Sequence, residues 1–446
     1  MSDSAATPPA PAADKGPIER LLSPFADVRR GEAASALLMM LTMFLILGGY
    51  YLLKTAREIF ILSEGGAEVK SYSSAGQALL LLVIVPAYGA IASRVNRKRL
   101  TPWITLFFAS NLLLFLGALA MHLRIAIVYF LWVGVFNVMV VAQYWALAND
   151  IYDEEQGKRL FPLIGIGSSL GAWVGSLRAG TLIESGGPWR LLAGAAAILV
   201  VCASLAGLAA RVTPRRAASS ATRDDVPLAR GQSGFGMILS DRYLMLIAAL
   251  VLLLNVVNTS GGYLFDRYVT ATADRMFAGP EAAAARAQFI GQTYSSYFSY
   301  VNLIGFLLQT FVVSRVFRFL GVGRALFIHP IVALTGYVGM LRAPSFEFIR
   351  WLKIADNSID YSLGNTTKQA LWLPTSLEAK YKAKQAVDAF CVRAGDVLQA
   401  GVVYSGELLS FTVTAFAALN IVFVLCWLAV VRGLQRSLRA NTRAKF

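Results

Sequence analysis

The sequence has few of the residues from which metal sites and disulfide frameworks are built. Its 446 residues include only two histidines, His122 and His329, and three cysteines, Cys202, Cys391 and Cys426. Two histidines are too few for a histidine-built metal site. The cysteines lie inside apolar segments, without metal-ligand spacing or a disulfide pattern. Phosphate-binding loops, nucleophile elbows and metal motifs are missing as well. We therefore expect no cofactor, no metal site and no enzymatic activity.

Charged residues are also scarce. They make up 15% of the chain, whereas a soluble globular protein usually carries about 25%. The apolar residues instead come in blocks of about 20–25, the length that spans a bilayer as a helix. The short alternating segments of a transmembrane β-barrel are not seen. The composition therefore predicts an all-α polytopic membrane protein.

The apolar blocks predict twelve transmembrane helices in two six-helix halves. We expect the spans at about 33–61, 73–93, 101–121, 125–149, 160–182, 189–211, 242–265, 290–314, 324–342, 346–372, 385–407 and 411–431. The predicted domains are a disordered N-terminus with a surface amphipathic helix (1–32), the N-terminal half (33–211), a cytoplasmic linker (212–241), the C-terminal half (242–431) and a basic cytoplasmic tail (432–446).

The formal net charge of +15 follows this topology. In a soluble domain such an excess would suggest nucleic-acid binding. Here nearly all clustered lysines and arginines fall on one side, in the loop at 94–99, the linker and the tail. By the positive-inside rule both termini are cytoplasmic. We expect a multi-pass protein of a bacterial-type inner membrane, a monomer whose partners are the lipid bilayer and a small anionic substrate, with no nucleic acid.

Two short motifs recur at matching topological positions. The Ser-Arg-Val-Asn-Arg motif at 93–97 returns as Ser-Arg-Val-Phe-Arg at 314–318, and the Glu-x-x-x-Lys pair at 154–158 returns at 378–382. The offsets of 221 and 224 residues nearly agree. They favour a parallel six-plus-six repeat, the plan of a major-facilitator-like transporter with its site between the halves. Basic residues in and beside these motifs are predicted to gate the cytoplasmic side: Arg94, Arg97, Lys158, Arg315, Arg318, Lys382 and Lys384.

The tenth predicted span carries an unusual polar stripe. On a helix of 3.6 residues per turn its members follow the i, i+3, i+4, i+7 ladder. They are Lys353, Asp356, Asn357, Asp360, Tyr361, Gly364, Asn365 and Lys368. A charge at the centre of a bilayer costs about 2.5–3.5 kcal/mol on insertion scales. The stripe therefore predicts the wall of a polar cavity.

Other spans carry charges that can face the same cavity. Lys54, Arg57 and Glu58 in the first span are spaced i, i+3 and i, i+4 and share one face. Such cations suit an anionic substrate through charge-assisted hydrogen bonds, while the carboxylates balance the empty cavity. An alternative is that the charges only pair with each other and fix helix packing. The predicted substrate-binding residues are Lys54, Arg57, Glu58, Tyr144, Trp145, Asn149, Arg178, Lys353, Asp356, Asn357, Asp360, Tyr361, Lys368, Arg393 and Asp396.

Three stretches carry a family resemblance. They are Leu-Lys-Thr-Ala-Arg-Glu at 53–58, the run from Tyr-Trp-Ala-Leu-Ala-Asn-Asp at 144–150 to Lys-Arg-Leu-Phe-Pro-Leu-Ile-Gly-Ile-Gly at 158–167, and the run from Thr-Lys-Gln-Ala-Leu to Lys-Ala-Lys-Gln-Ala-Val-Asp within 367–388. The chain resembles the non-mitochondrial ATP/ADP translocases of plastids and intracellular bacteria. The resemblance implies a twelve-span, major-facilitator-like fold and nucleotide exchange by alternating access.

The resemblance also implies roles for single residues. Lys54 and Arg57 would contact phosphates, assisted by Lys368 and by Lys382 or Lys384. The chain departs from the family in two places. The acidic residue of the family's fourth span has no counterpart in 132–137, and the family's order of arginine and lysine is swapped in the first span.

We therefore expect a secondary transporter that exchanges nucleotides or a related phosphorylated anion. One alternative is major-facilitator transport of another organic anion or of a lipid head group, with protons carried by Asp356, Asp360, Glu58 or Asp396. An alternative of another class is a non-transporting membrane scaffold or sensor, whose basic linker and tail bind a partner or anionic lipid. Only the transporters require the charges within the spans for function.

Overall fold

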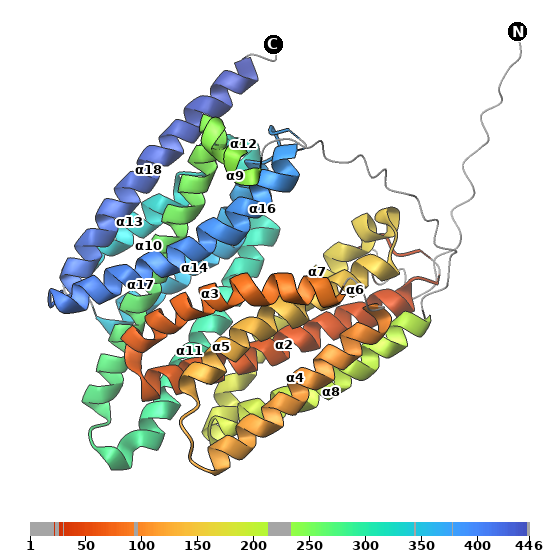
Figure 1. Cartoon of the computed structure of the whole chain (residues 1–446), viewed down its shortest axis with the longest axis vertical. Coiled ribbons are helices and arrows are strands. Elements are labelled where there is room, and N and C mark those ends of the chain that lie inside the picture. Colours follow the sequence, from red (N-terminus) through yellow and green to blue (C-terminus); the bar gives the residue numbers. More distant parts are fainter. Residues whose placement is uncertain are drawn as a thin grey trace, which may run out of the picture.

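The chain folds into helices throughout the part that the structure describes. The structure is a computed structural model that describes residues 22, 26–29, 31–92, 97–212, 233–342, 345–376 and 378–443. Helices follow one another along these residues and no strand occurs among them, which confirms the predicted all-α fold (Figure 1). Most of the predicted N-terminal segment 1–32, and residues 213–232 of the predicted linker, lie outside the described residues.

Each predicted span coincides with a helix or with a run of joined helices. In the first half these are α2 (Ala33–Glu64), α3 (Gly66–Ala92), α4 (Arg97–Ala120), α5 (Ala126–Phe136) with η1 (Asn137–Val141) and α6 (Ala142–Ile151), α7 (Glu154–Gly186) and α8 (Trp189–Val212). The second half begins with α9 (Gly234–Ser240), α10 (Arg242–Met276), η2 (Pro280–Ala282), α11 (Ala283–Leu307) with η3 (Leu308–Val312) and α12 (Val313–Ala325), and α13 (Ile328–Met340). It ends with α14 (Phe346–Ile359), η4 (Asp360–Gly364) and α15 (Asn365–Ala370), then η5 (Ala379–Ala383), α16 (Lys384–Ala386), η6 (Val387–Cys391) and α17 (Val392–Leu408), and finally α18 (Val413–Arg443).

Length and apolar composition separate these helices into two groups. Eight helices among the described residues are long and apolar enough to cross a membrane, and α8 and α13 add shorter apolar segments. The runs 346–370 and 379–408 are not among these apolar helices, and they carry much of the charge predicted to line a cavity. That all twelve runs cross a bilayer stays a prediction.

Several predicted boundaries were wrong because helices continue past the first charged residue. α3 begins at Gly66 rather than at residue 73, so Lys70 lies in a helix and not in a loop. α10 continues to Met276, and α18 continues to Arg443 through most of the predicted tail. A hydropathy window ends where charge begins, whereas a helix persists wherever its backbone bonds and side-chain contacts are satisfied.

The packing of the helices supports the predicted internal repeat. Within the first half α8 packs against α2 and α4, and within the second half α18 packs against α10 and α13. Between the halves α7 packs against α11, and α3 against α17. The first pair joins the fifth predicted span to the eighth, and the second pair joins the second span to the eleventh. A twofold relation between the halves exchanges one pair for the other, as a parallel six-plus-six repeat requires.

Two π-helical turns mark corresponding points of the halves. One lies at Asn137–Val141 in the fourth span and the other at Asp360–Gly364 in the tenth, 223 residues apart. This spacing falls between the two offsets found in the sequence. Such turns insert a residue into the α-helical ladder and frequently occur at functional sites. The second turn lies within the polar stripe, so the stripe's residues beyond it are rotated from their expected face.

Glycines allow the backbones of α2 and α7 to touch. A Cβ added at Gly167, Gly171 or Gly175 would clash with the carbonyl oxygens of Met40, Phe44 and Gly48 respectively. Stripes of small residues of this kind let membrane helices approach closely. The first half is therefore a tightly packed unit around these two helices.

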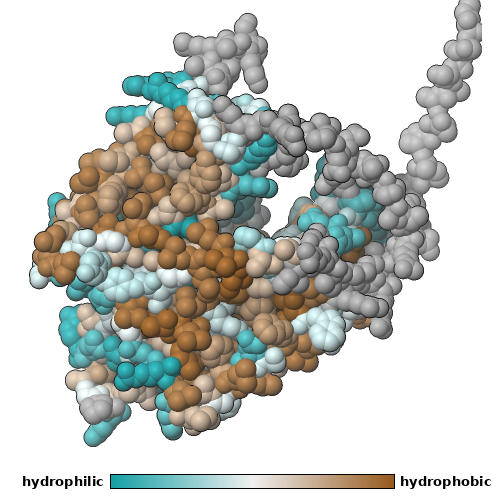
Figure 2. All heavy atoms as spheres, viewed as in Figure 1, coloured by the Kyte–Doolittle hydropathy of each residue, from teal (hydrophilic) through white to brown (hydrophobic). Residues whose placement is uncertain are grey.

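The halves separate at one end of the molecule. We call it the linker end, because α8 ends there and α9 begins there, on the two sides of the linker (Figure 1). The opposite end holds the turns at 121–125, 277–282 and 409–412. Figure 2 shows the molecule hollowed between the two halves toward the linker end.

Candidate functional site

A polar pocket lies where the two halves meet. Its volume is about 160 Å³. Its lining combines charged, amide and aromatic side chains from both halves: Lys54, Arg57, Glu58, Lys70, Asn258, Thr259, Gly262, Phe265, Asp266, Tyr294, Tyr297, Phe298, Lys353, Asn357 and Tyr361. The pocket therefore holds three predicted residues of the first span and three of the polar stripe.

One chain of ion pairs crosses between the halves beside this pocket, and we call it the inter-half network. Glu58 pairs with Arg57 at 2.5 Å and with Lys70 at 2.6 Å, and its side chain is only 1% exposed. Lys70 also pairs with Asp266 at 2.7 Å. The Tyr294 hydroxyl donates a hydrogen bond to Asp266. Since Lys70 belongs to α3 and Asp266 to α10, the network ties the first half to the second.

Lys54 is the exception among the basic residues of the pocket. Its ammonium lies 4.4 Å from the centre of the Phe298 ring and 5.1 Å from that of Tyr51. No carboxylate pairs with it among the residues that the structure describes. Two aromatic faces stabilise a cation, but less than a carboxylate does in a buried site. Lys54 thus offers the pocket a positive charge that is free to bind an anion.

A second set of charges lies within the C-terminal half, and we call it the C-half cluster. Lys353 pairs with Asp356 at 2.8 Å, and Nε2 of His329 lies 3.1 Å from the other oxygen of Asp356. Nδ1 of His329 lies 4.0 Å from Asp360, and Lys368 lies 3.4 Å from the same Asp360 oxygen. All five residues come from α13, α14, η4 and α15.

The predicted stripe is divided by this arrangement. Lys353, Asn357 and Tyr361 line the pocket between the halves. Asp356 and Asp360 contact His329 inside the C-terminal half instead. Lys353 takes part in both, because it lines the pocket and also binds Asp356. Its ammonium further donates to the carbonyl and side-chain oxygens of Asn258, at 3.1 and 2.6 Å.

The predicted aromatic residues of the fourth span lie away from the pocket lining. Tyr144 is fully buried in the first half, with its hydroxyl 3.2 Å from that of Thr105. Trp145 packs edge-to-face against Phe161. Asn149 is exposed. Substrate contact by these residues stays a prediction.

The predicted charges of the fifth and eleventh spans are also outside the pocket lining. Arg178 is exposed on α7. Arg393 pairs with Asp396 at 3.7 Å, and Asn255 donates to Asp396 at 2.9 Å. Because these contacts link α17 to α10, they connect elements of the same half. Their part in binding stays a prediction.

The predicted gating residues make contacts close to themselves in sequence. Arg315 donates to a carbonyl one turn earlier, and Arg318 lies over the ring of Phe319. Lys382 pairs with Glu378 at 2.8 Å. Lys158 is exposed and Lys384 is half-buried. Arg94 and the side chain of Arg97 lie outside the described part of the chain.

Polar contacts close the opposite end of the molecule between α3, α10 and α17. Arg267 lies 3.2 Å from Glu407 and 3.7 Å from Glu68. The Tyr263 hydroxyl lies 3.0 and 3.1 Å from the same two carboxylates. A half-exposed network of this kind holds two halves together without a large apolar interface.

A second seam closes the same end between α7 and α11. The Ser295 hydroxyl donates to the carbonyl of Ser176 at 2.7 Å, and Asn302 donates to the Ser176 hydroxyl at 3.1 Å. Gln292 donates to Glu184 at 3.0 Å. Both seams join the halves at this end, whereas the halves are hollowed toward the linker end.

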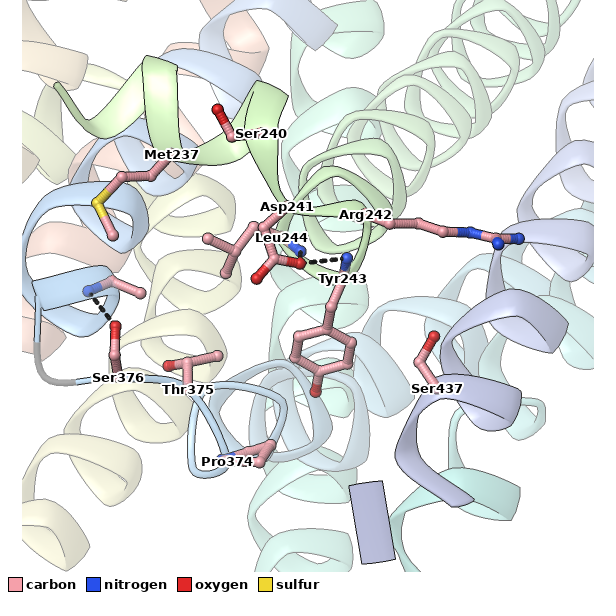
Figure 3. Close-up of a pocket in the computed structure, with 11 residues that line it drawn as sticks. Met237, Ser240, Asp241, Arg242, Tyr243, Leu244, Pro374, Thr375, Ser376 and Ser437 are labelled. Carbon is pink, nitrogen blue, oxygen red and sulfur yellow. Dashed lines mark hydrogen bonds between the residues drawn. The ribbon is translucent and has the colours of Figure 1, made fainter. Parts of the chain in front are cut away.

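A larger pocket of about 540 Å³ lies at the linker end of the C-terminal half (Figure 3). Its polar groups serve the local backbone. Asp241 caps α10 by accepting from the amides of Tyr243 and Leu244, and the Ser376 hydroxyl accepts from the amide of Ala379. None of the predicted substrate-binding residues lines it. The pocket between the halves therefore remains the candidate site despite its smaller volume.

Two residues at the centre of these clusters, Lys70 and His329, are absent from the predicted substrate-binding residues. Lys70 was assigned to a loop, because hydropathy starts the second span after it. His329 was set aside because a lone histidine builds no metal site. The available signal was its position inside an apolar span, where an ionisable side chain marks function by default.

Comparisons with known proteins find carriers among the relatives in sequence. The chain is 23% identical to ADP,ATP carrier protein 1 of Chlamydia muridarum over 69% of its own length and 64% of the relative's, so that match spans less than two thirds of the relative. It is 22% identical to ADP,ATP carrier protein 1 of Chlamydia trachomatis over 96% of its own length and 93% of the relative's. No protein-family model matches the chain.

Solved structures show the same fold. A bacterial homologue of the iron transporter ferroportin, in an inward-facing state, superposes with a TM-score of 0.61 at 13% identity and covers 88% of this chain and 98% of that one. The resemblance to ATP/ADP translocases and the major-facilitator-like fold are thereby confirmed. The fold is that of a polytopic membrane transporter, and the relatives that match in sequence are named as carriers, not as enzymes.

Proposed function

We propose that the protein exchanges nucleotides of the ATP/ADP type, or a related phosphorylated anion, by alternating access. The observation that carries the proposal is Lys54, a cation at the pocket between the halves. Aromatic faces lie against it, and no carboxylate within the described part of the chain pairs with it. Phosphate oxygens are strong acceptors for such a group. The names of the relatives supply the nucleotide.

The charge balance of the pocket supports an anion. Its lining contains four basic residues, Lys54, Arg57, Lys70 and Lys353, and two carboxylates, Glu58 and Asp266. The excess of two positive charges attracts a polyanion. Tyr297, Phe298 and Tyr361 add aromatic surface on which a base can stack. A non-transporting scaffold has no use for such a lining at the meeting plane of two halves.

The closed seams support alternating access. They join the halves at the opposite end, while the linker end is open. Rocking one half against the other breaks these seams and closes the linker end. By the positive-inside rule the linker end is cytoplasmic, so this conformation faces the cytoplasm of a cell whose inner membrane holds the protein.

The size of the pocket favours a second candidate substrate. A volume of about 160 Å³ is below the roughly 300–1,000 Å³ of pockets that hold drug-sized ligands. A small phosphorylated or organic anion fits without rearrangement, whereas a nucleotide requires the halves to move apart around it. Competition by inorganic phosphate, phosphate esters and organic acids distinguishes these substrates.

Counter-exchange in proteoliposomes tests the proposal. Vesicles loaded with ADP are expected to take up labelled ATP, and Lys54→Gln is expected to lower uptake by about 10- to 100-fold, the loss of one charged hydrogen bond. Arg275→Gln is the matched control, because this exposed arginine on α10 bonds only to its own helix among the described residues. Folded protein that exchanges no nucleotide under any gradient would contradict the nucleotide claim.

A further inference from the structure

The C-half cluster forms a continuous series of titratable groups. Lys368 lies 3.4 Å from Asp360, Asp360 lies 4.0 Å from His329, and His329 lies 3.1 Å from Asp356. Asp356 binds Lys353 at 2.8 Å, and Lys353 lines the pocket between the halves. The series therefore connects the interior of the C-terminal half to the candidate substrate site.

One nitrogen of His329, the Nδ1 that lies 4.0 Å from Asp360, has no hydrogen-bond partner among the described residues. The histidine is 5% exposed. Its Nε2 faces Asp356, so the neutral ring places its proton there and leaves Nδ1 as a base. A cavity of about 10 Å³ lies against the ring, enough for roughly one water. Lys368, Gly364 and Thr367 line the same cavity.

The charged groups around His329 are few. Asp356, Asp360 and Lys353 face it from α14 and η4, and Lys368 faces it from α15. α10 contributes the uncharged Asn258, which donates to Asp360 at 3.4 Å. α18 contributes the edge of Trp427, and α12 contributes Ala325. On α13 itself, Tyr337 binds a backbone carbonyl. With neutral histidine, two ammonium groups balance two carboxylates.

We propose that His329 is a proton-binding site whose protonation strengthens anion binding at Lys353. A proton enters through the small cavity and bonds to Nδ1. The imidazolium then lies between Asp356 and Asp360, and the cluster gains one positive charge. Asp356, now paired with the imidazolium, holds Lys353 less strongly, so the ammonium turns toward the pocket. The proposal rests on the proposed anion transport, and it adds the proton as a coupled ligand.

Linkage makes this coupling reciprocal. If a proton on His329 tightens anion binding, a bound anion must raise the proton affinity of His329 by the same factor. Coupling between sites is typically about 5- to 150-fold. Nucleotide or phosphate-ester binding is therefore accompanied by net proton uptake near neutral pH, and transport of the anion responds to a pH gradient.

Histidine nuclear magnetic resonance tests the site without any substrate. The chain contains only two histidines, so ring-labelled protein gives two sets of signals, and His329→Gln assigns them. The His329 signals are expected to change with pH as the ring binds its proton. Lys353→Met removes a neighbouring cation, so the titration midpoint should move to higher pH while that of His122 stays fixed. A ring that does not titrate, or an unchanged midpoint in Lys353→Met, overturns the proposal.

Calorimetry with ADP tests the coupling itself. Binding heats measured in buffers of different ionisation enthalpy give the number of protons taken up. Wild-type protein is expected to take up protons and to bind ADP about tenfold more tightly when His329 is protonated, and His329→Gln is expected to abolish the uptake. Equal uptake in wild type and His329→Gln contradicts the coupling. If ADP gives no heat at any pH, the nucleotide claim fails, and the histidine titration still decides whether the proton site exists.

Discussion

The inter-half network and the C-half cluster use the same chemistry in different mechanical positions. Each contains a lysine held in ion pairs: Lys70 binds Glu58 and Asp266, and the buried Lys353 binds Asp356. The first set connects two halves that separate in the proposed alternating-access cycle. The second lies within one half and moves with it. Similar ion pairs can therefore serve as a latch in one place and as part of a binding site in the other.

The difference has an energetic reason. A buried ion pair adds little net stability over an apolar pair, but it is costly to break by removing one partner. Across the halves, that sensitivity makes it costly to separate Lys70 from Glu58 and Asp266. Within the C-terminal half, the same cost of breaking an ion pair holds Lys353 beside Asp356, where Lys353 also lines the pocket. Four substitutions test whether the two sets of ion pairs differ in this way.

The largest effect is expected from Lys70→Met. It leaves Glu58 with Arg57 alone and Asp266 without a cation, at a loss of about 3–5 kcal/mol in unfolding free energy. Denaturant unfolding in detergent measures it. Combining Lys70→Met with Glu58→Gln and Asp266→Asn removes the unpaired charges and should recover most of the lost unfolding free energy. If Lys70→Met alone is as stable as wild type, the network does not hold the two halves together.

A smaller loss, about 2–3 kcal/mol, is expected from Lys353→Met. Asp356 keeps His329 as a neighbour, and a proton on that histidine can replace the lost cation. The loss should therefore shrink as the pH falls from about 8 to 6, near the ordinary range of imidazole. Thermal unfolding of both lysine variants across this range makes the comparison direct. Residue 70 has no histidine beside it, so the stability loss of Lys70→Met should not shrink at lower pH. An equal decrease of the loss in both variants would show that His329 does not distinguish the two sets.

Arg267→Gln probes the outer part of the seam. Its partners Glu68 and Glu407 are partly exposed, so we expect a loss of about 1 kcal/mol. The variant should also open the opposite end more often, which an impermeant thiol reagent detects through a cysteine placed at Thr259 in the pocket. Arg275→Gln on the same helix controls for loss of charge. Unchanged labelling would show that this network does not gate the pocket.

The smallest effect is expected at the linker end of the first half. Arg159 binds both oxygens of Glu32 at 2.9 Å. Burial raises the pKa of Glu32, but hydrogen bonds from Arg159, the amide of Arg29 and Gln156 outweigh it and hold the pKa below its ordinary value. A carboxyl group whose pKa is lower in the folded than in the unfolded protein stabilises the fold at pH values above its unfolded-state pKa. This stabilisation is lost as the pH falls through the folded-state pKa.

Glu32→Gln should therefore cost about 0.5–1 kcal/mol at neutral pH and progressively less below about pH 4.5. Melting temperatures of wild type and variant at several pH values measure this difference. A constant difference across the range would mean that the contact does not depend on the carboxylate's charge. Because this pair lies within one half, ADP should not change the difference.

Much of the fold follows from the hydropathy of the sequence. Apolar blocks predicted the helices, and two short repeated motifs predicted a six-plus-six repeat. The packing of α7 against α11 and of α3 against α17 is consistent with that repeat. Of the candidate site, the face shared by Lys54, Arg57 and Glu58 was predicted and lines the pocket. Lys70 was missed because its helix starts in a polar segment.

The periodicity of the tenth span placed its polar residues on one stripe, and the amino-acid sequence determines that much. Periodicity states which residues share a face, but it cannot state how the helix is rotated or what stands opposite. The tertiary structure decided that Lys353 faces both the pocket and Asp356, that Asp360 turns toward His329, and that a π-helical turn interrupts the ladder. The reason is physical: the cost of a buried charge forces it to find a partner, and only the packing of distant helices determines which partner is within reach.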